Sequence, residues 1–239
     1  MSVFEIDPGR SGLWDDQSES LRQRRDPVQT RRSILDAATE EFAAHGLEGG
    51  RTDRIASSAD VNKRMIFHYF GSKEGLFQAV LEENYARIRS AEAKLELAGR
   101  DPIEAMAELV EFSFDWFVEH PEFVPLLNEA NLHGGRHVKS SKQARDLTMP
   151  LVRQIENVLN RGVAQGQMRA GVDPIELYIT IAGISYLYFS NRHTLSGIFG
   201  RDLMAKGSLA SRRSHIVDVV LGYLRPDDGP EAAASHHED

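Results

Sequence analysis

The amino-acid sequence predicts an all-α protein. Every periodic segment between residues 27 and 225 repeats its apolar residues at the helical spacing, and no segment alternates as a half-buried strand would. The tetrapeptide Asp-Pro-Ile-Glu occurs twice, at 101–104 and 173–176, and each copy combines an N-cap, a first-turn proline and a glutamate able to reach back to the cap. These two observations predict helices throughout the structured part of the chain.

The helices follow one another with clear start and stop signals. Thr52, Asn62 and Ser72 are the expected N-caps of the second, third and fourth helices, while Gly46 and Pro226 mark ends. We expect helices over 26–46, 52–59, 62–70, from Ser72 for about five turns, from 101, over 121–132, 148–165, 173–196 and 208–225. The 173–196 helix is apolar nearly all round, which predicts burial on most sides.

Composition and charge limit the possible classes of protein. The 239 residues include no cysteine, which excludes disulfides and thiolate metal sites, and no apolar run is long enough to span a membrane. Residues 1–26 contain no apolar stretch typical of a signal peptide, so we expect a cytoplasmic protein without membrane contact. Residues 22–73 carry 10 Lys and Arg against 7 Asp and Glu, whereas the rest carries 18 against 29. This asymmetry favours nucleic-acid contact near the N-terminus.

The most informative stretch is residues 52–73, where two short helices flank Ala59-Asp60-Val61. Asp60 stands where the turn requires a left-handed backbone, which Asp tolerates better than most residues. Apolar side chains from both helices and from the preceding one complete a miniature core: Leu35, Phe42, Ile55, Val61, Ile66 and Phe70. This pattern predicts a helix-turn-helix, whose second helix lies in the major groove of DNA.

The same stretch resembles the TetR/AcrR family of transcriptional regulators. The matching residues run from Gln29 to Val80 and include Phe42-Ala43-x-His45-Gly46, Val61-Asn62-Lys63-Arg64, Tyr69-Phe70 and Ser72-Lys73-Glu74-x-Leu76-Phe77. Asp60 departs from the family, which usually has Gly there. The resemblance implies a homodimeric, ligand-responsive repressor that a small-molecule effector releases from a palindromic operator in double-stranded DNA. Together with the polar, aperiodic ends of the sequence, this predicts four parts: a flexible arm (1–26), a helix-turn-helix domain (27–73), a helical effector-binding and dimerisation domain (74–225) and a disordered tail (226–239).

Candidate DNA contacts follow from the faces of the short helices. Lys63, Arg64, Phe67 and His68 lie on the outer face of the third helix, and Arg64 best suits a bidentate contact to guanine. Thr52, Tyr69 and Lys73 lie near helix N-termini or ends, where phosphate contacts are common. For the arm residues Arg22, Arg24 and Arg25, minor-groove contact and a solvated tail are equally open.

Candidate effector and dimer residues lie in the second half of the chain. Aromatic and polar side chains there suggest a pocket lined by Trp116, Phe117, Phe123, Asn131, His133 and Tyr178, with Trp116 the foremost candidate. We expect the helices over about 173–196 and 208–225 to hold the homodimer as a four-helix interface. One apolar stripe on the last helix is the predicted contact surface: Ile216, Val217, Val220, Leu221 and Leu224.

Three alternatives remain open from the residues alone. His133 and His137 could suggest a metal site, but the intervening glycines make a rigid ligand pair doubtful and no third ligand is evident, so we expect no metal and no cofactor. A DNA-binding protein of this fold without an effector is a second possibility. A helical enzyme is a third, but the chain has no phosphate loop, nucleophile elbow or H-E-x-x-H motif, so we expect no enzyme.

Overall fold

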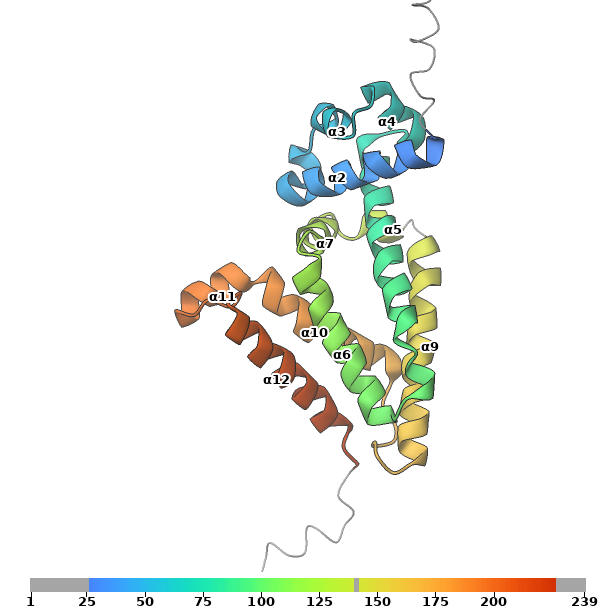
Figure 1. The fold of residues 1–239 in the computed structure, drawn as a ribbon, viewed down its shortest axis with the longest axis vertical. Helices are drawn as coiled ribbons and strands as arrows, with labels where there is room; N and C mark the ends of the chain where they lie inside the picture. Colours follow the sequence, from blue (N-terminus) through green and yellow to red (C-terminus); the bar gives the residue numbers. More distant parts are fainter. Residues whose placement is uncertain (1–25, 140–141, 227–239) are drawn as a thin grey trace, which may run out of the picture.

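The computed structural model describes residues 26–139 and 142–226, and these ranges contain helices and turns but no strand (Figure 1). This confirms the predicted fold class. A small head of three helices lies above a longer helical body, and the fourth helix, α5, joins the two. No helix of the described ranges is long and apolar enough to cross a membrane.

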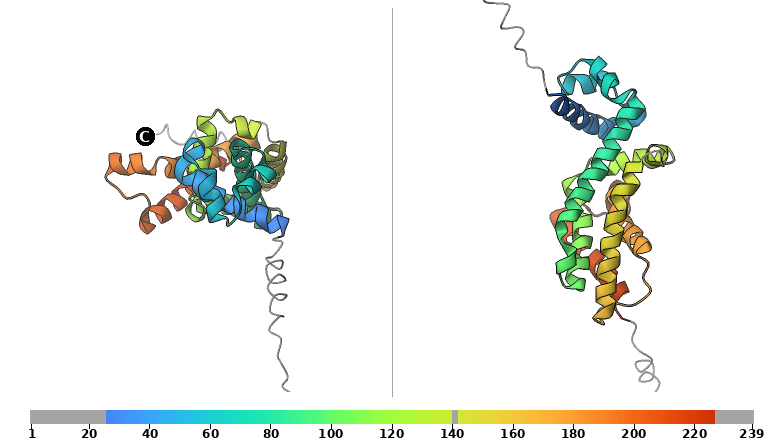
Figure 2. Two further views of the ribbon diagram at one scale, coloured as in Figure 1. Left: turned by 90° about the horizontal axis from the view of Figure 1, so that it is seen from above. Right: turned by 90° about the vertical axis from the view of Figure 1, so that its right-hand side faces the viewer.

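The head consists of α2 (Pro27–Gly49), α3 (Thr52–Ser58) and α4 (Lys63–Phe70), and α5 (Lys73–Glu92) leads out of it. After two short 3₁₀ turns, η1 (Ala93–Leu95) and η2 (Leu97–Gly99), the body continues with the remaining helices. These are α6 (Pro102–Glu119), α7 (Phe123–Leu132), α8 (Arg136–Lys139), α9 (Lys142–Ala164), α10 (Pro174–Ser190), α11 (Arg192–Phe199) and α12 (Lys206–Leu224). The helices α5 and α9 lie side by side along the body (Figure 2).

Local sequence signals account for most helix starts. The side chains of Asn62 and Ser72 accept hydrogen bonds from backbone amides in the first turns of α4 and α5, as predicted. Asp101 and Asp173 do the same at α6 and α10, with a proline at the first helical position. The prediction for Thr52 is wrong, because Arg51 holds the N-cap position of α3 and Thr52 is the first helical residue.

Helix ends in the body differ more from the prediction. The helix expected from 148 begins at Lys142, and Pro150 lies inside it. The helix expected over 173–196 is broken at Asn191, where α10 ends and α11 begins. Its predicted burial on most sides is not reached within the single chain, where Ile179 and Leu187 are 54% and 55% exposed. Composition alone does not show which apolar side chains the rest of the chain covers.

Two backbone positions shape the head. Asp60 has φ 52°, which confirms the left-handed turn between α3 and α4. Gly46 has φ 67° and ψ −179°, a conformation open essentially only to glycine, and it interrupts α2 before a last turn that ends at Gly49. The predicted stop at Gly46 is therefore a kink, which directs residues 47–49 toward the body.

The chain packs around two apolar cores. The head core contains Phe42, Ile55, Ile66 and Phe77, and the rings of Phe42 and Phe77 meet edge to face at 5.3 Å. It also includes two residues of the body helix α7, Leu126 and Ala130, both almost fully buried. The body core lies between α6, α9, α10 and α12. Helix α7 therefore belongs to both cores.

Candidate nucleic-acid interface and ligand cavity

The outer face of α4 presents the predicted base-reading residues. Ile66 is fully buried in the head core, and this fixes the rotation of the eight-residue helix. Lys63, Arg64, Phe67 and His68 are consequently exposed, and the Phe67 side chain, at 43% exposure, is unusually open for its type. The structure thus brings these four predicted residues onto one surface.

Among the cations of this surface, Lys63 and Arg64 differ. The ammonium of Lys63 lies 2.9 Å from the Asp53 carboxylate of α3, an exposed ion pair of small energetic value. Within residues 26–139 and 142–226, no carboxylate lies within ion-pair distance of Arg64. Arg64 can therefore reach a base without first giving up an ion pair inside the described chain.

Lys73, predicted to contact phosphate, also makes contacts within the head. Its ammonium donates to the carbonyl oxygens of Glu48 and Gly50 at 3.2 and 3.3 Å, so it satisfies acceptors at the end of α2. Thr52 and Tyr69 are partly buried at the edge of the α4 surface, and the Tyr69 ring contacts the His68 ring at 5.3 Å. These two bonds link the start of α5 to the end of α2, and the third N–H of the ammonium is left for a phosphate.

Hydrogen bonds between Arg54 of α3 and Glu41 of α2 hold these two helices together, and the sequence did not predict this contact. The Arg54 guanidinium donates to both carboxylate oxygens of Glu41, with Nε at 2.8 and 2.9 Å, and the Arg51 amide donates to the same group. Hydrogen bonding by Arg54 holds the pKa of the Glu41 carboxyl below its usual value. The spacing of a carboxylate on one helix and an arginine on the next gives no sequence signal for such a contact.

Helix α7 makes a polar contact with the head in addition to its apolar ones. One carboxylate oxygen of Glu129 accepts a hydrogen bond of 2.8 Å from the backbone amide of Leu47, in the turn that follows the Gly46 kink. The same oxygen lies 3.1 Å from Nε2 of His133. A Cβ atom added at Gly46 would stand 3.0 Å from the other oxygen of Glu129, so the approach is close.

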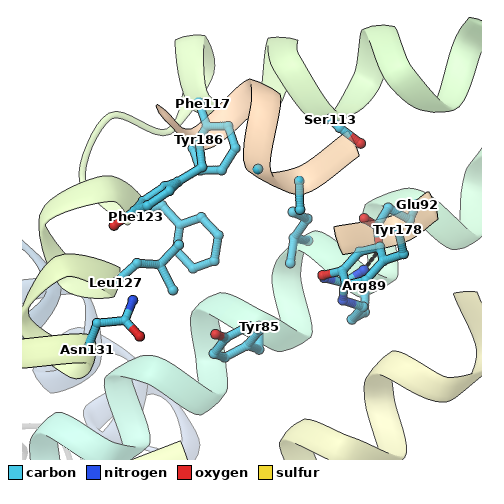
Figure 3. Close-up of a pocket in the computed structure, with 13 residues that line it drawn as sticks. Tyr85, Arg89, Glu92, Ser113, Phe117, Phe123, Leu127, Asn131, Tyr178 and Tyr186 are labelled. Carbon is cyan, nitrogen blue, oxygen red and sulfur yellow. Dashed lines mark hydrogen bonds and ion pairs between the residues drawn. The ribbon is translucent and has the colours of Figure 1, made fainter. Parts of the chain in front are cut away.

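A cavity of about 260 Å³ lies in the body, between α5, α6, α7 and α10 (Figure 3). Small-molecule sites in proteins are typically apolar with a few placed polar groups, and this volume is near the small end of their range. Aromatic and aliphatic side chains form most of its wall: Tyr85, Ile88, Phe117, Phe123, Leu127, Tyr178 and Tyr186. The cavity therefore suits a small ligand with a flat apolar body.

One end of the cavity is charged. Arg89 and Glu92 lie one turn apart on α5, form a buried ion pair and leave 7% and 4% of their side chains exposed. A second guanidinium nitrogen of Arg89 donates to the Tyr178 hydroxyl at 2.8 Å. Burial raises the pKa of the Glu92 carboxyl to about 7, against the opposing effect of Arg89.

The structure places the six residues predicted for an effector pocket in different surroundings. Phe117, Phe123, Asn131 and Tyr178 line the cavity, whereas Trp116 and His133 do not. The Trp116 ring packs on the His120 ring at 3.9 Å and is not part of the cavity wall, where its neighbour Phe117 represents this part of α6. His133 instead contacts Glu129.

Sequence reasoning missed the charged end of the cavity. Arg89 and Glu92 follow Tyr85 at helical spacing and share the face of the apolar residue Ile88. A charged pair inside an otherwise apolar stripe was the signal that could have found them.

The stripe predicted as the dimer interface lies mostly inside the protein. Ile216, Val220 and Leu224 are at most 1% exposed and belong to the body core, because α12 packs on α6 with this face. Val217 and Leu221 are partly buried at the edge of the same core. On α12, the large apolar residues that remain exposed to solvent are Val219 and Tyr223, at 44% and 52% exposure.

The head geometry and its exposed α4 surface define a helix-turn-helix DNA-binding protein with a ligand-sized cavity in its body. Comparison with known proteins agrees. Residues 34–80 match the family described as bacterial regulatory proteins, tetR family, and residues 102–220 match the tetracyclin repressor-like C-terminal domain.

The chain aligns with three known regulators over more than 90% of their length. The chain is 43% identical over 196 residues to the HTH-type transcriptional repressor NicS of Pseudomonas putida, covering 82% of this chain and 92% of NicS. It is 28% identical over 204 residues to the repressor AcnR of Corynebacterium glutamicum, with 84% and 96% covered. The solved transcriptional regulator SCO4942 of Streptomyces coelicolor superposes with a TM-score of 0.60 at 26% identity, over 82% of this chain and 98% of that one. The chain belongs to the TetR family of DNA-binding transcriptional regulators.

Proposed function

We propose that this regulator is a homodimeric repressor that leaves a palindromic operator when a small molecule occupies the cavity of its body. The observation that carries this proposal is the position of α7. One face of α7 lines the cavity through Phe123, Leu127 and Asn131, while Leu126 and Ala130 on its other face belong to the head core. A ligand that moves α7 therefore acts directly on the DNA-binding head.

The polar contact of α7 strengthens this connection. Glu129 bonds the Leu47 amide beyond the kink of α2, so a displacement of α7 has to break or shift that hydrogen bond. Allosteric effects require two arrangements that bind the ligand with different affinity. The cavity and the head share one short helix, and this helix is the element expected to move.

Recognition of DNA is assigned to α4 in this proposal. Arg64 reads a base, Lys63, Phe67 and His68 adjoin it, and Thr52 and Tyr69 contact phosphates at the edge of the surface. Two observations support this assignment: the four α4 residues are exposed, and no carboxylate of residues 26–139 and 142–226 pairs with the Arg64 guanidinium. Lys73 positions the end of α2 and contributes at most one phosphate contact.

The homodimer is assigned to the open faces of α10 and α12. Ile175, Ile179 and Leu187 recur on one side of α10 and are 47–55% exposed, and Val219 and Tyr223 continue an apolar surface on α12. Pairing these faces between two copies would cover them in a four-helix interface. Ile179→Asp and Leu187→Asp are expected to give monomers by sedimentation. Dimers that persist in both variants would place the interface elsewhere.

The experiment for the whole proposal has two stages. A DNA duplex is first selected from a random pool with the full-length protein, and small metabolites are screened by thermal shift, because a ligand of the folded state raises its stability. Compounds that bind are then titrated against the protein–duplex complex. Loss of DNA binding by the wild type but not by the cavity-filling variant Ala182→Phe supports the proposal. If the bound compounds leave the complex intact, the protein is a DNA-binding protein without this effector response.

A further inference from the structure

The charged end of the cavity is a costly arrangement that the fold does not require. Arg89 and Glu92 are both almost fully buried, and apolar residues in place of a buried ion pair often give equal or higher stability. The Nε–H of Arg89 is buried without a hydrogen-bond partner in the described ranges, which adds to the cost. An unsatisfied donor at the wall of a cavity indicates an acceptor that arrives from outside the chain.

The other contacts of Arg89 show how an acceptor would be held. One terminal nitrogen donates to the Tyr178 hydroxyl, and the guanidinium carbon lies 5.3 Å from the centre of the Tyr178 ring. The Tyr178 hydroxyl has its own proton left to donate, since it accepts from Arg89. In Figure 3, Arg89, Glu92 and Tyr178 gather at one end of the cavity, away from Phe117, Phe123 and Tyr186. Arg89 and Tyr178 together offer two donors to one group.

The two residues of the ion pair differ in how readily they become neutral. An arginine remains charged in any protein environment, whereas the buried carboxyl of Glu92 takes up a proton near neutral pH. Once Glu92 is neutral, the charge of Arg89 makes this end of the cavity positive, and this favours an anionic ligand. A cation would have to share Glu92 with Arg89 and would add a second positive charge beside it.

We propose that the cavity binds a small aromatic carboxylate, whose carboxylate bonds Arg89 and Tyr178 in place of Glu92 and whose ring packs between Phe117, Phe123 and Tyr186. The planar carboxylate matches the fork of donors of a guanidinium. The aromatic walls favour a ring, and a volume of about 260 Å³ limits the ligand to a small one. This proposal rests on the proposed function only in taking the cavity as the effector site.

Three probes of nearly equal shape test the charge of the ligand. Benzoate, neutral benzamide and cationic benzamidine are titrated by calorimetry into the full-length protein without DNA. We expect benzoate to bind and benzamide to bind about tenfold more weakly or less, since it lacks the charge-assisted bonds to Arg89. Benzamidine that binds better than benzoate overturns the proposal. Absence of benzoate binding at about 10 mM, where even weak fragments register, also overturns it.

Two variants assign the binding to the residues named. Arg89→Gln is expected to abolish benzoate binding, whereas Glu92→Gln, which frees the guanidinium, leaves it unchanged or tighter. Arg153→Gln removes an exposed cation of α9 that is not part of the cavity wall, and it serves as the matched control with wild-type benzoate affinity. Circular dichroism confirms that each variant is folded, and a folded Arg89→Gln that binds benzoate normally contradicts the assignment. So does a Glu92→Gln variant that loses benzoate.

The binding assay and the DNA assay can fail separately. If benzoate binds through Arg89 and the protein–duplex complex is unaffected, the ligand class is right and the effector role is wrong. If a neutral or cationic compound in the cavity releases the duplex while benzoate does not bind, the effector role is right and the ligand class is wrong.

Discussion

Removal of the Glu129 carboxylate should loosen the head from the body. In Glu129→Ala, the Leu47 amide loses its acceptor at 2.8 Å, and Leu47 is only 1% exposed, so water replaces the carboxylate poorly. A hydrogen bond to a charged group contributes about 1.5–3 kcal/mol, and the Glu129 side chain is 16% exposed, so screening is modest. We expect the free energy of unfolding to fall by about 2 kcal/mol.

Hydrogen exchange and denaturation measure this effect directly. The Leu47 amide should exchange faster in Glu129→Ala, and urea denaturation should give the lower stability. Glu129→Gln keeps a carbonyl acceptor and should lose less. Glu122→Ala is the matched control, because Glu122 also pairs with a histidine beside α7, His120 at 3.3 Å, but makes no bond to the head. Unchanged exchange at Leu47 in Glu129→Ala would refute the reasoning.

The remaining predictions concern the kink, the two head cations and the buried carboxyl. Gly46→Ala forces a side chain into a glycine-only conformation against Glu129 and should cost about 1–3 kcal/mol in thermal denaturation, and an unchanged melting temperature would count against the kink. Arg64→Ala should leave the melting temperature unchanged and weaken the selected duplex by about 1–3 kcal/mol, in contrast to a scrambled one. Lys73→Ala should lower the melting temperature instead, because two carbonyl acceptors lose their donor, and equal melting of the two variants would contradict this difference. Glu92 binds its proton more tightly in the folded state, where its pKa is about 7, than in the unfolded state, where it is about 4.5. The protonated carboxyl therefore favours the folded state below pH 4.5, and this contribution to the free energy of unfolding is lost as the pH rises to 7. The wild type should therefore lose stability over this range relative to Glu92→Gln, and parallel curves would show that burial does not raise this pKa.

The parts of the structure that the sequence predicts are those that depend on local chemistry. Asn62 and Ser72 cap their helices because a side-chain oxygen two or three bonds from Cα reaches the next amides in almost any context. Asp60 turns left-handed for an equally local reason. The exposed face of α4 followed once Ile66 was assigned to the core.

The parts that it does not predict depend on which helices pack together. Periodicity marks a stripe on α12 as apolar, but only the contact with α6 shows that Val220 is buried within the chain. Trp116 and Phe117 are adjacent, and the rotation of α6 decides which of them faces the cavity. Arg89 gains its role from Tyr178, a residue 89 positions away on another helix.

In the proposed function, occupancy of the body cavity changes the DNA affinity of the head. The most direct measurement is the dissociation constant of the selected duplex by fluorescence anisotropy, with and without a saturating compound that calorimetry shows to bind the wild type but not Ala182→Phe. Coupling of about 1–3 kcal/mol predicts a dissociation constant at least about fivefold higher with the compound bound. Identical dissociation constants at full occupancy of the cavity would contradict the claim.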